Sequence, residues 1–128
     1  MTRLPPSARP TPPPGLKLRV VVQGGDWLGP GKADLLQYID ETGSISAAGK
    51  QMGMSYKRAW GLVEVLNSMF AKPLVSASRG GADHGGAALT DTGREVLALF
   101  RKMQTIAAQS VSAEMAALDK FCDLSDRK

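Results

Sequence analysis

The spacing of apolar residues in the first third of the chain predicts a strand followed by a helix. Between Leu16 and Gln23 the apolar positions alternate and then run together as valines, a pattern typical of a strand. A cluster of glycines with one proline ends this strand before Lys32. From Lys32 to Glu41 apolar residues recur every three or four positions, which predicts a helix that Gly43 ends.

The segment 43–70 predicts two more helices joined by a tight turn. Ser44 and Ser55 are suited to cap the N-termini of helices, and Gly53 is suited to the bend between them. Ala48 and Gly49 are small enough to let the two helices pack closely. The helix expected at 56–70 has one apolar face, which consists of Ala59, Val63, Leu66 and Phe70. Two helices about a tight turn indicate a helix-turn-helix.

The chain after residue 73 predicts a hairpin and then one long helix. Leu74 to Ser78 and Ala87 to Leu89 are expected to pair as strands around a glycine-rich loop, which makes the hairpin a wing. Thr90 is suited to cap the helix that follows, and apolar residues then recur at intervals of three or four as far as Cys122. An unbroken helix over about 91–122 would be about 45 Å long, so we expect a second copy of the chain to cover its outer part.

These elements predict a fold that is mainly α with a small β component. It is a winged helix-turn-helix with an N-terminal strand and a long C-terminal dimerisation helix. Residues 1–15 contain six prolines and two arginines, which predicts a disordered arm, and residues 16–128 form the single domain for which a chain of 128 residues has room. The residues expected at the dimer interface are Val96, Phe100, Met103, Ala107, Val111, Met115 and Leu118.

The positive charge of the chain is concentrated in the helix-turn-helix and wing. The net charge is +4, and the segment from Thr42 to Ala82 has five basic residues against the single acid Glu64, so this third of the chain holds the whole excess. The alternative on charge alone is a solvated basic face that has no partner. The coincidence of charge and motif favours DNA.

A helix-turn-helix places its second helix in the major groove and lays the first across the DNA backbone. Tyr56 and Lys57 can reach base edges or phosphates, and Arg58 can bind a guanine or the backbone. Trp60 has two interpretations, as a wedge in the core or as a DNA contact. In the wing, Arg79 is expected to contact phosphate, whereas His84 is expected to face solvent. The predicted DNA-binding residues are Ser46, Lys50, Ser55, Tyr56, Lys57, Arg58, Trp60 and Arg79.

Several other classes of protein do not fit the sequence. Cys122 is the single cysteine, so neither a disulfide scaffold nor a zinc or other metal site is expected. No apolar run approaches the roughly 20 residues needed to span a bilayer, so we expect a cytoplasmic protein without a membrane partner. The histidine, the cysteine and the carboxylates form no catalytic arrangement, so we expect neither enzymatic activity nor a cofactor.

Two strings of residues resemble a known family. Residues 43–48 (Gly-Ser-Ile-Ser-Ala-Ala) together with 54–60 (Met-Ser-Tyr-Lys-Arg-Ala-Trp) resemble the N-terminal domain of the molybdate-responsive, ModE-type transcriptional regulators, which are related to LysR-type regulators. Residues 88–93 extend the resemblance, which covers about Leu16 to Met103. It implies a winged-helix domain that dimerises through its long helices and binds a palindromic operator controlling molybdate uptake or molybdenum-dependent enzymes.

The resemblance leads us to expect a homodimeric transcriptional regulator that binds double-stranded DNA. Full-length members of the family also carry C-terminal modules that sense molybdate. Because this chain ends at Lys128, directly after the expected long helix, we expect it to lack those modules and not to bind molybdate. Two alternatives stay open, namely a protein-interaction module that docks on another regulator through the long helix and a LysR-like DNA-binding domain unrelated to molybdenum.

Overall fold

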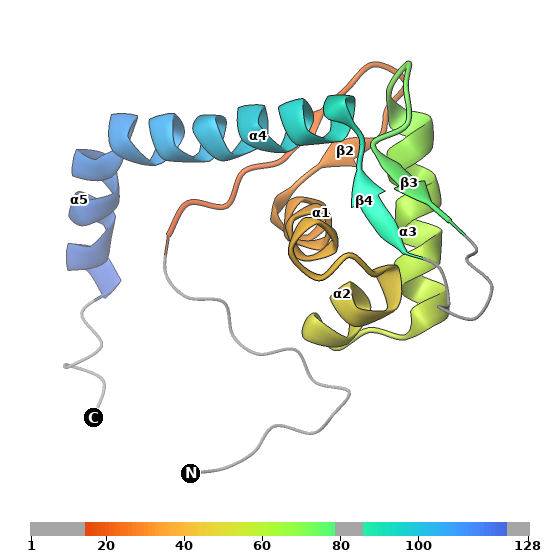
Figure 1. The fold of residues 1–128 in the computed structure, drawn as a ribbon. Coiled ribbons are helices and arrows are strands. Elements are labelled where there is room, and N and C mark those ends of the chain that lie inside the picture. The colour runs from red at the N-terminus through yellow and green to blue at the C-terminus, as the bar shows by residue number, and fades with distance from the viewer. Residues whose placement is uncertain (1–14, 79–85, 123–128) are drawn as a thin grey trace, which may run out of the picture.

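Two small hairpins and five helices make up the part of the chain that the computed structural model describes, residues 15–78 and 86–122 (Figure 1). Each hairpin is a two-stranded antiparallel sheet. The fold is mainly α with a small β component, as the sequence predicts. The elements in chain order are β1 (Val20–Val21), β2 (Trp27–Leu28), α1 (Pro30–Thr42), α2 (Ile45–Gln51), α3 (Tyr56–Met69), β3 (Val75–Ala77), β4 (Ala87–Leu89), α4 (Asp91–Ser110) and α5 (Ser112–Cys122).

The N-terminal strand expected at 16–23 is shorter in the structure. Only Val20–Val21 is paired, and its partner Trp27–Leu28 is a strand that the sequence did not predict. The difference arises because the glycine cluster forms the turn of a hairpin instead of leading directly to the first helix. Gly24 and Gly25 have φ values of +91° and +97°, a region that favours glycine. The predicted arm, by contrast, falls almost wholly in residues 1–14, which lie outside the described residues.

Trp27 joins this first hairpin to the start of α1. The Lys32 ammonium donates a hydrogen bond to the Trp27 carbonyl oxygen at 2.8 Å and lies 3.7 Å from the centre of the Trp27 ring, while the Arg19 guanidinium lies 3.9 Å from the same ring. Burial lowers the pKa of Lys32, an effect that Asp26 partly opposes and Arg19 reinforces. Lys32 is therefore part of the packing between the hairpin and α1.

The helix ends in the motif use the residues that the sequence predicts. Gly43 ends α1 in the left-handed conformation with φ 72°, and Gly53 has φ 69° in the turn between α2 and α3. The side chains of Ser44, Ser55 and Thr90 accept hydrogen bonds from backbone N–H groups at 3.0, 3.1 and 2.9 Å, at the starts of α2, α3 and α4. The boundaries of the motif are thus fixed by local chemistry.

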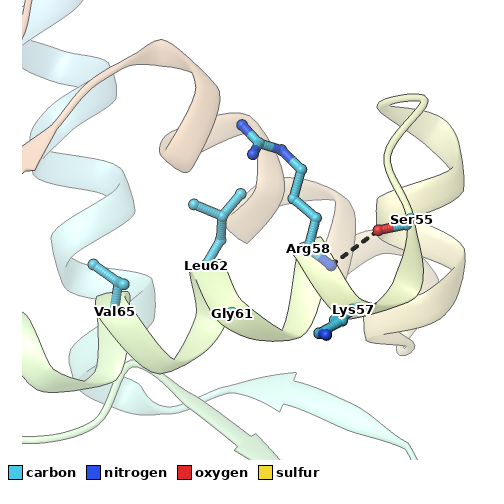
Figure 2. Close-up of a pocket in the computed structure, with 6 residues that line it drawn as sticks. All are labelled: Ser55, Lys57, Arg58, Gly61, Leu62 and Val65. Carbon is cyan, nitrogen blue, oxygen red and sulfur yellow. Dashed lines mark hydrogen bonds between the residues drawn. The ribbon is translucent and has the colours of Figure 1, made fainter.

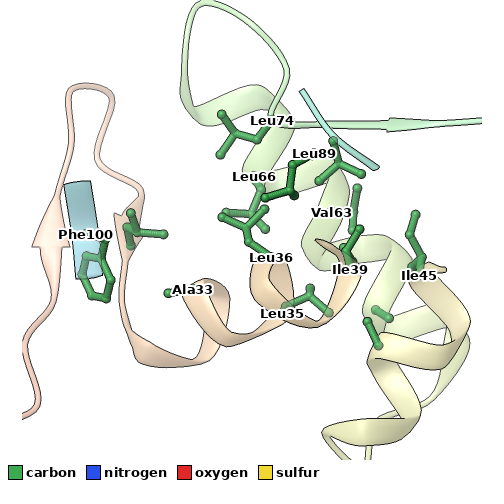
Figure 3. Packing of buried hydrophobic residues seen from close by; sticks show 14 residues of the cluster. Ala33, Leu35, Leu36, Ile39, Ile45, Val63, Leu66, Leu74, Leu89 and Phe100 are labelled. Carbon is green, nitrogen blue, oxygen red and sulfur yellow. The ribbon is translucent and has the colours of Figure 1, made fainter. Parts of the chain in front are cut away.

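The core lies where α1 meets α3, the second hairpin and α4. Its largest fully buried side chains, all labelled in Figure 3, are Phe100, Leu35, Leu36, Ile39, Leu66, Leu74 and Val63. Between α1 and α4, Arg101 donates hydrogen bonds to Asp34 at 2.9 Å and to Gln37 at 2.5 and 3.0 Å. These contacts hold α4 across the layer of helices that contains the motif (Figure 1).

The prediction of one unbroken helix over about 91–122 is wrong, because the structure has two helices there, α4 and α5. The chain breaks at Val111 (φ −118°, ψ 18°), and α5 turns away from the axis of α4 (Figure 1). Ser110 and Ser112 flank the break, and their hydroxyls donate to the carbonyl oxygens of Ala107 and Gln109 at 3.0 and 3.1 Å. Such bonds compete with the helical pattern and bend helices, which the apolar periodicity does not reveal.

One predicted interface residue is also corrected by the packing. Phe100 is fully buried within its own chain, so its side chain is part of the core and not of an exposed face of α4. The predicted row of interface residues therefore includes a residue of the core. No helix in the described part of the chain is long and apolar enough to cross a membrane.

Candidate nucleic-acid interface

The helix-turn-helix is held together by close contact between α2 and α3. A Cβ placed on Gly49 of α2 would lie 3.0 Å from the Ala59 Cβ of α3, so the small residue predicted there is needed for the approach. The Met54 N–H donates to the Gly49 carbonyl oxygen at 3.0 Å and closes the turn. The second helix is therefore fixed at one angle to the first.

The outer face of α3 carries the predicted contact residues of its first turn. Ala59, Val63 and Leu66 face the core, so the opposite side of the helix is open to solvent. Tyr56 is 58% exposed, and Lys57 and Arg58 are exposed beside it. This end of α3 therefore presents an aromatic side chain and two cations together, the types of side chain that contact phosphates and base edges.

The predicted contacts on α2 and at the cap of α3 are also accessible. Ser46 and Lys50 are exposed on α2. Ser55 is exposed as well, with its hydroxyl oxygen accepting a hydrogen bond from the Arg58 N–H, and the hydroxyl proton remains available to an acceptor on a ligand. Arg79 and His84, predicted for the wing, lie outside the described residues.

Trp60 packs toward the core. Its side chain is half-buried against the core cluster and lies edge-on to Tyr56 with 6.1 Å between ring centroids. The indole Nε1 is buried and has no hydrogen-bond partner in the described chain. Of the two interpretations of this residue, the structure favours the wedge in the core.

Asn67 connects α3 to the wing, and sequence reasoning missed it. Its side-chain oxygen accepts hydrogen bonds from the N–H groups of Leu74 and Val75 at 2.8 and 2.9 Å, and its amide donates to the Val75 carbonyl oxygen at 3.1 Å. A helical asparagine between Leu66 and Ser68 gives no signal of this role in the sequence. The side chain fixes the start of β3 against α3.

Thr90 holds α4 to the same stretch of chain. Besides capping α4, its hydroxyl donates to the Pro73 carbonyl oxygen at 2.7 Å, and its N–H donates to the Leu74 carbonyl oxygen at 2.9 Å. We call residues 73–75 the junction, because α3 and α4 are both hydrogen-bonded to it. The predicted pairing of the wing is confirmed as β3 with β4, in the register Val75 with Leu89, Ser76 with Ala88 and Ala77 with Ala87.

A shallow hollow on the outer face of α3 is a further feature that the sequence did not reveal. It has a volume of about 400 Å³ and is open to solvent. Figure 2 shows Arg58, Leu62 and Val65 projecting to one side of the helix, with Lys57 on the near side and Gly61 bare between them. Its lining residues are Ser55, Lys57, Arg58, Gly61, Leu62 and Val65.

The apolar residues exposed on α4 form a different row from the predicted one. Leu99, Met103 and Ile106 are 59%, 41% and 54% exposed and follow one another at helical spacing, which places them on one face. Of the other residues predicted for the interface, Leu118 is exposed, while Val96, Ala107, Val111 and Met115 are half-buried. Leu99, Ile106 and Phe121 are exposed but were not predicted, because the predicted row assumes one continuous helix through the whole segment.

No group of three or more histidine, cysteine or acidic side chains within the described ranges is placed to hold a metal ion. Cys122 is exposed at the end of α5. The candidate functional features are the exposed cations in the first turn of α3, the adjoining hollow, and the wing that Asn67 connects to α3.

Solved structures define the class of fold as a winged helix-turn-helix like that of LysR-type DNA-binding domains. The crystal structure of the CbnR_DBD–DNA complex matches 69% of this chain and 95% of its own with a TM-score of 0.56 and 23% sequence identity. The full-length LTTR LysG from Corynebacterium glutamicum matches 73% of this chain and 30% of its own with a TM-score of 0.53 and 22% identity.

The resemblance to ModE-type regulators is confirmed by similar sequences. The molybdenum-pterin-binding protein MopB of Rhodobacter capsulatus is 38% identical over 73% of this chain and 35% of its own length. The transcriptional regulator ModE of Haemophilus influenzae is 31% identical over 86% of this chain and 44% of its own. The chain thus spans less than half the length of these relatives, and no family model matches it.

Proposed function

We propose that the chain is a sequence-specific transcriptional regulator that binds a palindromic operator as a homodimer and serves molybdenum metabolism. The first turn of α3 carries the proposal, because Tyr56, Lys57 and Arg58 are exposed together at the capped end of a helix whose other face is in the core. In helix-turn-helix proteins this end of the second helix enters the major groove.

The DNA partner and the molybdenum link are supported by the similar proteins. CbnR_DBD was solved in complex with DNA, and the Escherichia coli relative, 38% identical over 56% of this chain, is a DNA-binding transcriptional dual regulator, ModE. The Azotobacter vinelandii relative, 40% identical over 55% of this chain, is a molybdenum transport protein, ModE. These names support the proposal that the target genes serve molybdenum transport or use.

Six of the predicted contacts have a role in this proposal. Arg58 binds a guanine edge, and Lys57 and Tyr56 contact bases or phosphates. Ser46 and Lys50 contact the DNA backbone, across which α2 lies. Arg79 of the wing remains a proposed phosphate contact. The phosphate contacts supply affinity for any duplex, whereas the base contact supplies the preference for one sequence.

Arg58 provides a test that separates preference from affinity. Binding is measured by fluorescence anisotropy to a duplex that the wild-type chain selects from a random library and to a scrambled duplex of equal length. Arg58→Lys keeps the charge but loses the planar fork, so it should reduce the preference roughly tenfold with little loss on scrambled DNA. Arg58→Ala should weaken binding to both duplexes. A wild-type chain that binds both duplexes equally would refute the proposed function.

The homodimer is supported by the apolar row on α4. Leu99, Met103 and Ile106 would leave a continuous apolar face in water, and a two-fold axis would place the same face of a second copy against it. A symmetric pair of motifs would in turn require two half-sites about one helical turn of DNA, roughly 34 Å, or a multiple of it apart.

A second candidate is a protein-interaction module. Phe121 and Leu118 on α5 are 86% and 66% exposed, so they offer an apolar surface beyond the row on α4. Such a module would be monomeric and would show no sequence preference on DNA, so the measurements on the wild-type chain distinguish it from the regulator.

A further inference from the structure

Gly61 is a helical residue whose lack of a side chain the fold does not require. It lies in the interior of α3, where glycine stabilises a helix less than alanine does. A Cβ placed on it would meet nothing within 4 Å in the described chain, and no positive φ is present at this position. By contrast, Gly49 and Gly93 are in close contact with neighbouring atoms. The open space at Gly61 therefore serves no packing partner among the residues that the structure describes.

The position of Gly61 relates it to the proposed DNA contacts. Residues three and four apart are neighbours on a helix surface, so Gly61 has Glu64 on one side and, toward the hollow, Lys57, Arg58 and Val65. These three residues line the hollow with Leu62. An alanine or larger residue at position 61 would occupy part of the hollow, between the two cations and the two apolar side chains (Figure 2).

The chemistry of the hollow indicates which part of a DNA duplex fits it. Its cationic edge suits phosphates or a guanine, as proposed above for Arg58 and Lys57. Its other edge, Leu62 and Val65, is apolar and offers no hydrogen bond to a base. The apolar group that unmodified DNA presents in the major groove is the C5-methyl group of thymine.

We infer that Gly61 keeps open a binding site on α3 for the C5-methyl group of one thymine in each half-site, with Leu62 and Val65 as its apolar wall. The inference rests on the proposed function, because it assigns a base to the helix proposed to enter the major groove. It makes Gly61 a determinant of sequence specificity, and it places the thymine next to the base pair that Arg58 contacts.

Gly61→Ala and a matched control test the role of the open space. Gly31→Ala also adds a methyl group to an exposed helical glycine with nothing within 4 Å among the described residues, but in α1. Both variants should melt no lower than the wild type by circular dichroism. Gly61→Ala should bind the selected duplex about tenfold more weakly than the wild type, and Gly31→Ala should bind it equally well.

Replacing single thymines in that duplex by uracil, which lacks the methyl group, tests the assignment. One replacement per half-site should weaken wild-type binding severalfold and leave binding by Gly61→Ala unchanged. Val65→Thr keeps the size of the side chain but makes it polar. This variant should show a smaller difference in affinity between the thymine and uracil duplexes than the wild type does. If no single replacement affects the wild type, or if its effect persists in Gly61→Ala, the inference is wrong. A wild-type chain without any preferred duplex would instead refute the proposed function.

Discussion

Gly93 is the residue at which the fold leaves no space for a side chain. A Cβ placed there would lie 2.1 Å from the carbonyl oxygen of Leu74, and that oxygen belongs to the backbone of the junction, which also accepts a hydrogen bond from Thr90. The first turn of α4 therefore packs directly against the junction. The side chain of glycine is the only one that this contact admits.

Gly93→Ala should lower the free energy of unfolding by about 1–3 kcal/mol, because the methyl group forces α4 away from the junction. Urea denaturation followed by circular dichroism measures the change. Gly31→Ala serves as the control, since the same methyl group enters open space and should leave stability equal or up to about 1 kcal/mol higher. Equal stabilities for the two variants would contradict the packing described here.

Asn67 makes its contribution through hydrogen bonds. Asn67→Ala should destabilise the fold by about 1–3 kcal/mol, because it leaves the N–H groups of Leu74 and Val75 without their acceptor. Ser68→Ala, which removes an exposed hydroxyl from the next position of α3, should change stability by less than about 0.5 kcal/mol. Amide hydrogen exchange of Leu74 and Val75 should rise in Asn67→Ala only.

Residues that act through local chemistry were predictable from the sequence, and residues that act across the fold were not. Ser44, Ser55 and Thr90 cap helices because of their own side chains and the next three positions, so a short stretch of sequence identifies them. Gly93 and Asn67 matter because of atoms that lie elsewhere in the fold. Trp60 was ambiguous for the same reason, since its environment depends on the packing of α3.

At the scale of the element, α3 carries the electrostatic part of the proposed interface. Lys57→Ala should reduce the slope of log affinity against log salt concentration by about one, because one fewer counterion is released from the DNA. Lys102→Ala removes the same charge from an exposed position of α4 and should leave the slope unchanged. Anisotropy titrations at several salt concentrations measure both. Equal slopes for the two variants would show that Lys57 makes no phosphate contact.

The helices of the motif were predicted to within a few residues, whereas the first hairpin and the end of α4 were not. Helical periodicity repeats over several turns and therefore gives a strong signal for α1 and α3. A strand of only two residues, such as β2, is too short for a pattern. Apolar residues continue at helical spacing through the break at Val111, so the periodicity predicted one helix where there are two. The hydroxyls of Ser110 and Ser112 bond to backbone carbonyl oxygens beside this break.

At the scale of the whole molecule, the apolar row on α4 determines the proposed assembly. Leu99→Glu with Ile106→Glu should convert a dimer into a monomer, because two carboxylates would enter an apolar interface without partners. Sedimentation velocity measures the change, and circular dichroism should show that the fold is retained. Thr105→Glu adds a charge at an exposed position of α4 away from the row and should leave the dimer intact. Unaltered sedimentation of the double variant would place the interface elsewhere.

The junction also links the two ends of the proposed function energetically. Asn67 holds the junction to α3, the helix proposed to enter DNA, and Thr90 holds it to α4, the helix proposed to bind a second copy. Removing one of these side chains should therefore also weaken the hydrogen bonds that the other makes to the junction. A double-mutant cycle with Asn67→Ala and Thr90→Val in urea should therefore depart from additivity by at least about 0.5 kcal/mol. Strict additivity would mean independent anchors. If association of two copies and binding of the operator are coupled through the junction, each must change the affinity of the other by the same factor.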